Sequence, residues 1–310
     1  MTIDNFAIDS RVSVGVLAWA VFFPLLAIAQ NGHVVARIEF ASGSQEFRAE
    51  EVAYLSDGLR IKGYLLTPAQ EGKHPCIIFN RGGNPQLDSL SRESVVRGHA
   101  AMLASAGYMI VASQYRQGGG SEGYDEFGGN DVHDVLNLIP LLEHEPACDA
   151  SRIGMFGVSR GGMMTYLTLT KTDRIRAAVV LSGLSDLALN LKSRPDDMGK
   201  VYQTYIPDYG RRREQALAER SAVRWAEKID KKTPLLVLQG TADWRVGPAE
   251  SLEMADALLR SKHPFRFVLF EGGAHGLPEH RIEVDRLLLN WFNDYLRDGK
   301  KWPSLEPHGQ

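Results

Sequence analysis

The feature that most restricts the fold is an alternation of short apolar runs with longer segments of helical periodicity. The apolar runs have the length of buried strands, and they lie at residues 76–80, 108–113, 153–157, 177–182, 235–239 and 265–270. Apolar residues spaced for one helix face predict helices at residues 94–106, at 132–143, from Gly161 onward and at 281–296. Such alternation is typical of βαβ units. We therefore predict an α/β fold with a mostly parallel central sheet and helices on both faces.

Two segments depart from this alternation. Residues 47–55 and 59–66 are strand-like and flank Ser56-Asp57-Gly58, which predicts an antiparallel hairpin. Residues 184–232 are polar and helix-prone and lie between two predicted strands, so we expect a helical insertion over one end of the sheet. This insertion contains Arg211-Arg212-Arg213, which is either a solvated helix face or a binding site for an anionic substrate.

Composition excludes several classes of protein. The 310 residues carry a formal net charge of −3, so the chain lacks the strongly basic character of nucleic-acid-binding proteins. Two cysteines are too few for a disulfide scaffold or a cysteine-based zinc site. None of the nine histidines belongs to a metal-binding motif. We expect no metal, no cofactor and no nucleic-acid partner.

The beginning of the chain predicts an export signal. Residues 12–29 are uncharged and mostly apolar, and they end in Ala27-Ile28-Ala29, a small-x-small pattern that signal peptidases cleave. We expect residues 1–29 to be a signal peptide cleaved after Ala29, which leaves residues 30–310 as one catalytic domain in the periplasm or outside the cell. The alternative is an uncleaved membrane anchor formed by residues 12–29, since such a run nearly suffices to span a bilayer. Without that anchor, we expect no stable membrane association.

A sharp strand-to-helix turn is predicted at Gly157-Val158-Ser159-Arg160-Gly161-Gly162. The motif follows the predicted strand 153–157 and opens a predicted helix. A serine at such a turn is exposed for reaction, and the residues two positions away on each side must be small. Gly157 and Gly161 meet that requirement. We therefore interpret Ser159 as a nucleophile.

A serine nucleophile needs a base and an acid, which in this topology follow it in the order acid, then base. Asp243 comes just after the predicted strand 235–239, and His275 lies in Gly272-Gly273-Ala274-His275-Gly276, just after the last strand. We assign Asp243 as the acid and His275 as the base, with Asp186 and His280 as the alternatives.

The oxyanion of an acyl-transfer intermediate needs backbone N–H donors. The amide of Arg160 opens the helix after Ser159 and supplies one donor. The amide of Arg81 or Gly82, in the loop after the strand 76–80, is the candidate for the second. The alternative for this Gly-rich loop is a plain turn.

These motifs together resemble the prolyl oligopeptidase family of serine peptidases, within the α/β-hydrolase superfamily. The resemblance covers about residues 47–298. Gly157–Gly162 resembles that family's Gly-x-Ser-x-Gly-Gly, residues 115–123 (Tyr-Arg-Gln-Gly-Gly-Gly-Ser-Glu-Gly) are similar to its Arg-Gly-Ser-Gly-Gly loop, and residues 81–86 loosely match its His-Gly-Gly-Pro turn. The resemblance implies cleavage of peptide or other amide bonds through an acyl-serine intermediate.

The chain also departs from the family. No segment fits the N-terminal β-propeller or the glutamate pair found in some members, and Arg81 stands where some members use a tyrosine. Hydrolysis of carboxylic esters on the same triad is therefore the main alternative, and a non-catalytic binding module is a remote one. The expected partner is a peptide or a small ester or amide substrate.

Two further features remain open. Cys76 opens one predicted central strand and Cys148 precedes its expected neighbour, so the pair forms either a disulfide in an oxidising compartment or two buried thiols. The loop 118–129 carries Glu122, Asp125 and Glu126. These acidic residues either line the substrate pocket, where they would favour a cationic substrate, or are ordinary loop residues.

Overall fold

The computed structural model describes residues 1–2, 30–87 and 89–309. The predicted export signal therefore lies almost wholly outside the described residues. Within these residues, no helix has the length and apolar character needed to cross a bilayer.

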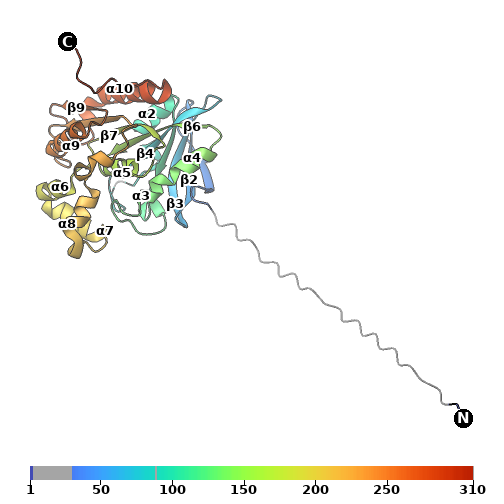
Figure 1. Ribbon diagram of the computed structural model, residues 1–310. Helices are drawn as coiled ribbons and strands as arrows, with labels where there is room; N and C mark the ends of the chain where they lie inside the picture. The colour runs from blue at the N-terminus through green and yellow to red at the C-terminus, as the bar shows by residue number, and fades with distance from the viewer. Residues whose placement is uncertain (3–29, 88, 310) are drawn as a thin grey trace.

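Nine strands form one mixed sheet in the order β1-β2-β3-β5-β4-β6-β7-β8-β9 (Figure 1). The strands from β5 to β9 in that order are parallel to one another, whereas β3 pairs antiparallel with β5. The strands are β1 (Val34–Phe40), β2 (Phe47–Ser56), β3 (Leu59–Pro68), β4 (His74–Asn80), β5 (Met109–Ser113), β6 (Cys148–Val158), β7 (Ile175–Leu181), β8 (Leu235–Gly240) and β9 (Phe265–Phe270). The carboxyl ends of the parallel strands meet at one edge of the sheet. The predicted α/β-hydrolase fold is confirmed.

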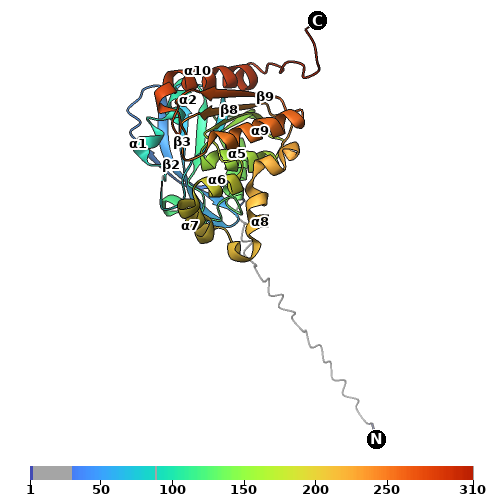
Figure 2. The same ribbon diagram turned by 90° about the vertical axis from the view of Figure 1, so that its left-hand side faces the viewer.

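Helices cover both faces of the sheet (Figures 1 and 2). One face packs against α1 (Arg92–Val95), α2 (His99–Ser105) and α10 (Arg281–Phe292), and α10 continues as a short π-helix, η5 (Asn293–Arg297). The other face packs against α3 (Val132–Leu136), α4 (Leu138–His144), α5 (Arg160–Leu169) and α9 (Pro248–Arg260). Neighbouring residues of β4 divide between the two cores, since Ile77 packs into one and Ile78 into the other. Burial on both faces explains why the central strands are uniformly apolar.

The predicted hairpin is present. Strands β2 and β3 pair antiparallel up to Ser56 and Leu59, and the two loop residues Asp57 and Gly58 have φ values of 53° and 79°. Positive φ at both loop positions matches the twist of the flanking strands.

Two elements were not predicted from the sequence, and two predicted helices are interrupted, since the one at 132–143 is divided at Asn137 into α3 and α4. Strand β1 is largely exposed on both faces, although residues 36–40 (Ala-Arg-Ile-Glu-Phe) alternate apolar and charged side chains. Helix α9 was not predicted either. The helix predicted at residues 94–106 is split into α1 and α2, and α2 begins after Gly98.

The predicted insertion between β7 and β8 is helical. It consists of α6 (Leu187–Ser193), α7 (Pro195–Tyr205) and α8 (Tyr209–Arg220), with the short turns η2 (Ala222–Arg224) and η3 (Ala226–Lys228). Arg211 is exposed on α8, while Arg212 contacts Gln215 and Glu219 of the same helix. All three arginines of the Arg211–Arg213 cluster are exposed, and none of them lines the cavity beside Ser159. The cluster is therefore a solvated helix face.

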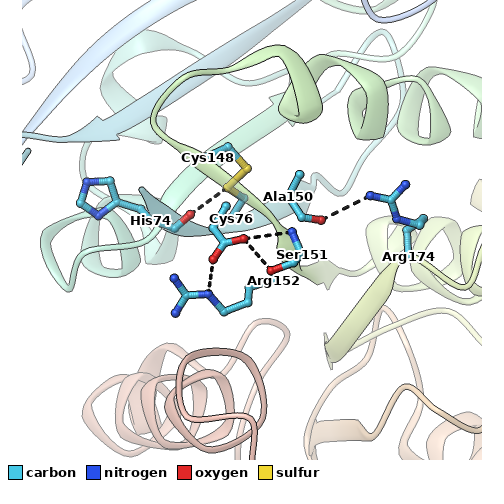
Figure 3. Close-up of a disulfide and its surroundings, with 8 residues drawn as sticks. His74, Cys76, Cys148, Ala150, Ser151, Arg152 and Arg174 are labelled. Carbon is cyan, nitrogen blue, oxygen red and sulfur yellow. Dashed lines mark hydrogen bonds and ion pairs between the residues drawn. A yellow bond between two sulfur atoms is a disulfide. The ribbon is translucent and has the colours of Figure 1, made fainter. Parts of the chain in front are cut away.

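Cys76 and Cys148 are joined by a disulfide (Figure 3). The two cysteines stand at the amino-terminal parts of β4 and β6, which are hydrogen-bonded neighbours. Because Ser159 follows the carboxyl end of β6, the disulfide lies at the sheet edge opposite to that serine.

Candidate active site

Ser159 occupies a strained turn between β6 and α5. Its φ is 58° and its ψ is −123°, a conformation that L-residues rarely adopt. The Ser159 N–H donates to the carbonyl oxygen of Leu181 at 3.0 Å, and the Ser159 carbonyl accepts from Gly162 at 2.9 Å. These bonds hold the turn against the end of β7 and fix the serine in place.

The glycines around Ser159 are required by close backbone approaches. A Cβ atom at Gly157 would lie 2.2 Å from the carbonyl oxygen of Gly161, and a Cβ atom at Gly161 would lie 1.9 Å from the carbonyl oxygen of Asn80. Neither backbone oxygen can move aside as a flexible side chain could. The requirement for small residues that was inferred from the motif thus has a direct steric cause.

Asp243 and His275 are brought together after β8 and β9. The Nδ1 atom of His275 lies 2.9 Å from Asp243 Oδ2 and 3.1 Å from Asp243 Oδ1. With Nδ1 bound to the carboxylate, the other ring nitrogen, Nε2, is left to exchange a proton with a hydroxyl. Since β6, β8 and β9 are parallel strands of one sheet, Ser159, Asp243 and His275 all lie at its carboxyl edge.

The Asp243 carboxylate is buried and held by several donors. Its Oδ1 accepts from the amides of Arg245 at 2.9 Å and Val246 at 3.0 Å, and its Oδ2 accepts from Gln239 Nε2 at 3.3 Å. Burial raises the pKa of Asp243, but the hydrogen bond and charge of His275 and the Val246 amide outweigh burial and hold that pKa below its usual value. Asp243 is therefore an anion at neutral pH.

Ser182 links the aspartate to the histidine loop. Its hydroxyl accepts from the Gly276 N–H at 3.1 Å, and hydrogen bonding to this hydroxyl contributes to the lowered pKa of Asp243. Ser182 is fully buried just after β7, with a φ of 47°. Ser182 was not predicted as part of the site, and its place as the last residue of the predicted strand 177–182 was the available signal.

Two backbone amides lie close to Ser159 in the chain or in space, those of Arg160 and Gly82. A Cβ atom at Gly82 would lie 3.7 Å from Ser159 Oγ, so the Gly82 backbone approaches the serine closely. No hydrogen bond among the described residues uses the Gly82 N–H. Arg160 is the first residue of α5, so its N–H has no partner within the helix. This arrangement fits the expected oxyanion donors.

The Arg81 side chain is engaged elsewhere. Its guanidinium is buried, and it donates from Nε to the Gln114 carbonyl at 3.1 Å and from Nη1 to the Gly82 carbonyl at 2.8 Å. Burial and the nearby charge of Arg160 lower the pKa of Arg81 to about 10. The side chain thus braces the loop after β4, which leaves only the Arg81 backbone as a potential oxyanion donor.

The Arg160 side chain binds two buried carboxylates. Its Nη2 atom contacts Asp125 at 2.8 Å and Asp131 at 2.5 Å, and its Nη1 donates to the Gly83 carbonyl at 3.2 Å. Arg160 thereby ties the loop 118–131 to the loop that contains Gly82. The two arginines Arg81 and Arg160 are an internal scaffold of the site.

The acidic loop residues do not form a site for a cationic substrate. Asp125 is bound by Arg160, Glu126 accepts from Asn130, and Glu122 pairs with Arg60. That interpretation of the loop was wrong, because the sequence could not show that these carboxylates already have partners within the chain.

The alternative acid and base have other roles. Asp186 accepts from the amides of Ala188 and Leu189 and caps the start of α6. His280 binds the Glu271 carbonyl at 3.0 Å through Nε2 and packs against Phe270. Neither residue contacts the Asp243–His275 pair among the described hydrogen bonds.

A cavity of about 460 Å³ opens beside Ser159. Its walls come from the loop after β4, from α7 and from the loop after Asp243. The helical insertion therefore covers the serine and shapes the space in which a substrate would lie. Among the described residues, no three His, Cys, Asp or Glu side chains are grouped as ligands of a metal ion.

The amino-acid sequence is similar to those of known proteins. The chain is 29% identical over 264 residues to an uncharacterized peptidase, YtmA, of Bacillus subtilis, and the match covers 84% of this chain and 99% of that protein. It is 27% identical to the human acylamino-acid-releasing enzyme over 271 residues, which are 80% of this chain and 35% of that enzyme. The chain thus spans about a third of the longer relative.

Solved structures agree with the fold. One described as an acylaminoacyl peptidase in complex with a chloromethyl ketone matches with a TM-score of 0.68 and 25% identity, over 84% of this chain and 43% of that chain. The acetyl xylan esterase 1 of Thermoanaerobacterium matches with a TM-score of 0.62 and 19% identity, over 83% and 86% of the two chains, which supports the fold alone.

The model of the prolyl oligopeptidase family matches residues 94–299, which are more than half of the chain. The matched segment contains Ser159, Asp243 and His275. The resemblance predicted from the motifs is confirmed: the chain belongs to the prolyl oligopeptidase family of serine-type hydrolases.

Proposed function

We propose that the protein is a serine peptidase that cleaves amide bonds through an acyl-Ser159 intermediate, with His275 as the base and Asp243 as the acid. The observation that carries the proposal is the hydrogen bond between His275 Nδ1 and the buried Asp243 carboxylate, on the sheet edge that also holds the strained turn of Ser159. Buried donors fix that carboxylate, so the imidazole is held in one orientation and one tautomer.

The steps follow from this arrangement. Ser159 Oγ forms a bond to the substrate carbonyl carbon while its proton passes to His275 Nε2. The amides of Arg160 and of Gly82 or Arg81 stabilise the resulting oxyanion. When the carbon–nitrogen bond breaks, the proton on His275 moves to the leaving amine. Water then attacks the acyl-serine, again through His275, and releases the acid and free Ser159.

Matched substrates test the proposal. An amide and an ester with the same acyl group are compared by kcat/KM, in the wild type and in Ser159→Ala and His275→Ala. We expect amide cleavage in the wild type and losses of similar size in both variants, since the members of a triad act as a unit. Ester cleavage without amide cleavage would instead assign a carboxylesterase. Turnover of neither substrate would favour a binding module.

We also propose export, supported by the apolar run 12–29 with its Ala27-Ile28-Ala29 end and by the Cys76–Cys148 disulfide. In a bacterial host that expresses the full chain, the mature protein should begin at Gln30 and appear in the periplasm or medium. Full-length protein in the membrane fraction would assign residues 12–29 as an anchor. Full-length protein in the cytosol would contradict export.

A further inference from the structure

We propose that the cavity beside Ser159 selects substrates that carry a carboxylate close to the scissile bond. This inference rests on the proposed function, because it assigns the substrate class of the same site.

The cavity wall is positively charged. Apart from Arg160, which is paired with two buried carboxylates, Asp125 and Asp131, the charged residues that line it are Arg194, Asp197, Lys200 and Arg245. Three of these four are cations. The single carboxylate, Asp197, is already 3.3 Å from Arg194 Nη2. An anionic substrate group would therefore meet an excess of positive charge, and a cationic one would be repelled.

Two of the cations, Arg194 and Arg245, contact the ring of Trp244. The Arg194 guanidinium lies 4.9 Å and that of Arg245 5.5 Å from the Trp244 ring. Arg194 also donates to the Arg245 carbonyl at 3.2 Å. No described carboxylate lies within ion-pair distance of Arg245. The fold thus holds two like charges together on an indole ring, an arrangement that a bound anion would stabilise.

Three residues that line the cavity carry a donor with no partner among the described residues, and all three atoms are buried: Arg160 Nε, Arg194 Nε and the Tyr205 hydroxyl. Burial raises the pKa of Tyr205, so the hydroxyl keeps its proton and can donate. A buried donor without an acceptor is costly, and a carboxylate oxygen accepts hydrogen bonds from both kinds of group.

These residues lie in the helical insertion and just after Asp243. Arg194 caps the start of α7 and Tyr205 ends it, while Trp244 and Arg245 directly follow the candidate acid. The cations line the same cavity as Ser159, so a carboxylate bound to them would lie in the cavity that holds the bond attacked by Ser159. A cavity of about 460 Å³ has room for an acidic amino-acid side chain.

The test compares substrates that differ only in this charge. Peptide anilides with Glu or with its neutral isostere Gln, on the acyl side of the scissile bond, are assayed for kcat/KM. A second pair of peptides places Glu or Gln on the leaving side. We expect the Glu substrate of at least one pair to be preferred about tenfold or more, the size of effect typical of charge-assisted hydrogen bonds. The preference should shrink as salt concentration rises.

Arg194→Gln should reduce the preference to about threefold or less, with thermal unfolding recorded to confirm that the variant is folded. Arg211→Gln is the matched control, because Arg211 is exposed on α8 and lies outside the cavity. It should keep the wild-type preference. Equal kcat/KM for Glu and Gln in both pairs would overturn the inference while the peptidase proposal stands. Absence of turnover for all four substrates and for simple esters would overturn the peptidase proposal itself.

Discussion

The Nδ1 atom of His275 lies 2.9 Å from Asp243 Oδ2, although the two residues are 32 positions apart and follow different strands. The sheet produces this contact, because β8 and β9 are parallel neighbours whose carboxyl ends coincide. Buried donors on the other side of the carboxylate, from Val246 and Gln239, fix its orientation. The pair therefore presents the free side of the imidazole in one geometry, as a general base requires.

Replacing Asp243 with asparagine should nearly abolish activity. An amide of the same shape fills the site, but its NH2 group would compete with the ring N–H and would favour the wrong tautomer of His275. We expect kcat to fall by a factor on the order of 10⁴, with little change in KM. Steady-state kinetics on an activated ester measures this. A loss of less than about tenfold would contradict the assignment of Asp243 as the acid.

The same substitution should alter how stability depends on pH. Because the folded-state pKa of Asp243 is lowered, its contribution to the free energy of unfolding is complete above its unfolded value of about 4. That contribution is lost as pH falls through the lower, folded-state pKa. The stability difference between wild type and Asp243→Asn should therefore narrow below about pH 4, as urea unfolding at several pH values would reveal. A difference that widens under acid conditions would be inconsistent with a lowered pKa.

Gly161→Ala should destabilise the protein and disrupt the turn of Ser159. The added methyl group would lie 1.9 Å from the Asn80 carbonyl oxygen, which belongs to the backbone and cannot rotate away. We expect a loss of about 3 kcal/mol or more in the free energy of unfolding. Gly210→Ala on α8 is the control, since its methyl group would meet no heavy atom within 4 Å. The control should be neutral or stabilising by up to about 1 kcal/mol. Equal stability of both variants would refute the steric argument.

Arg160→Met should be strongly destabilising because it leaves Asp125 and Asp131 buried without their cation. Breaking such a network typically costs about 3–5 kcal/mol. Removing the two negative charges as well, with Asp125→Asn and Asp131→Asn, should restore much of the lost stability. Chemical unfolding of the single and triple variants measures both effects. A single variant within about 1 kcal/mol of wild type would show that the ion pairs contribute little.

The disulfide should be detectable and stabilising. The denatured, unreduced protein is expected to contain no free thiol, because Cys76 and Cys148 are its only cysteines. Their sequence separation of 72 corresponds, in the chain-entropy model, to roughly 4 kcal/mol of stabilisation, of which strain can remove part. The double variant Cys76→Ala and Cys148→Ala should therefore unfold more easily than the oxidised wild type, by about 2–4 kcal/mol. Two titratable thiols in protein from an oxidising compartment would contradict the bridge.

Much of the fold follows from local sequence patterns. Apolar runs predicted β4 through β9, although β6 begins at Cys148 rather than at residue 153 and β9 is a partly exposed edge strand. Strand β1 was not predicted, although residues 36–40 alternate apolar and charged side chains; the strand is largely exposed, and its pairing with β2 holds it in the sheet. The positions of Ser159, Asp243 and His275 follow from the rule that reactive residues of such sheets lie after the strands.

The surroundings of these residues could not be predicted in the same way. Arg81, Arg160 and Asp125 owe their roles to contacts between segments far apart in the chain, and no spacing encodes such contacts. Ser182 also acts through a partner 94 positions away. The cavity depends on how α7 folds over the sheet, which local helical propensity does not specify.

The central claim is that Ser159 is a nucleophile activated by its surroundings, and covalent labelling tests it most directly. A fluorophosphonate probe reacts with the hydroxyl of an activated serine, and peptide mass spectrometry locates the adduct. We predict one adduct per protein, on Ser159, and none on Ser159→Ala. Absence of labelling on well-folded protein, or equal labelling of Ser159→Ala, would contradict the account.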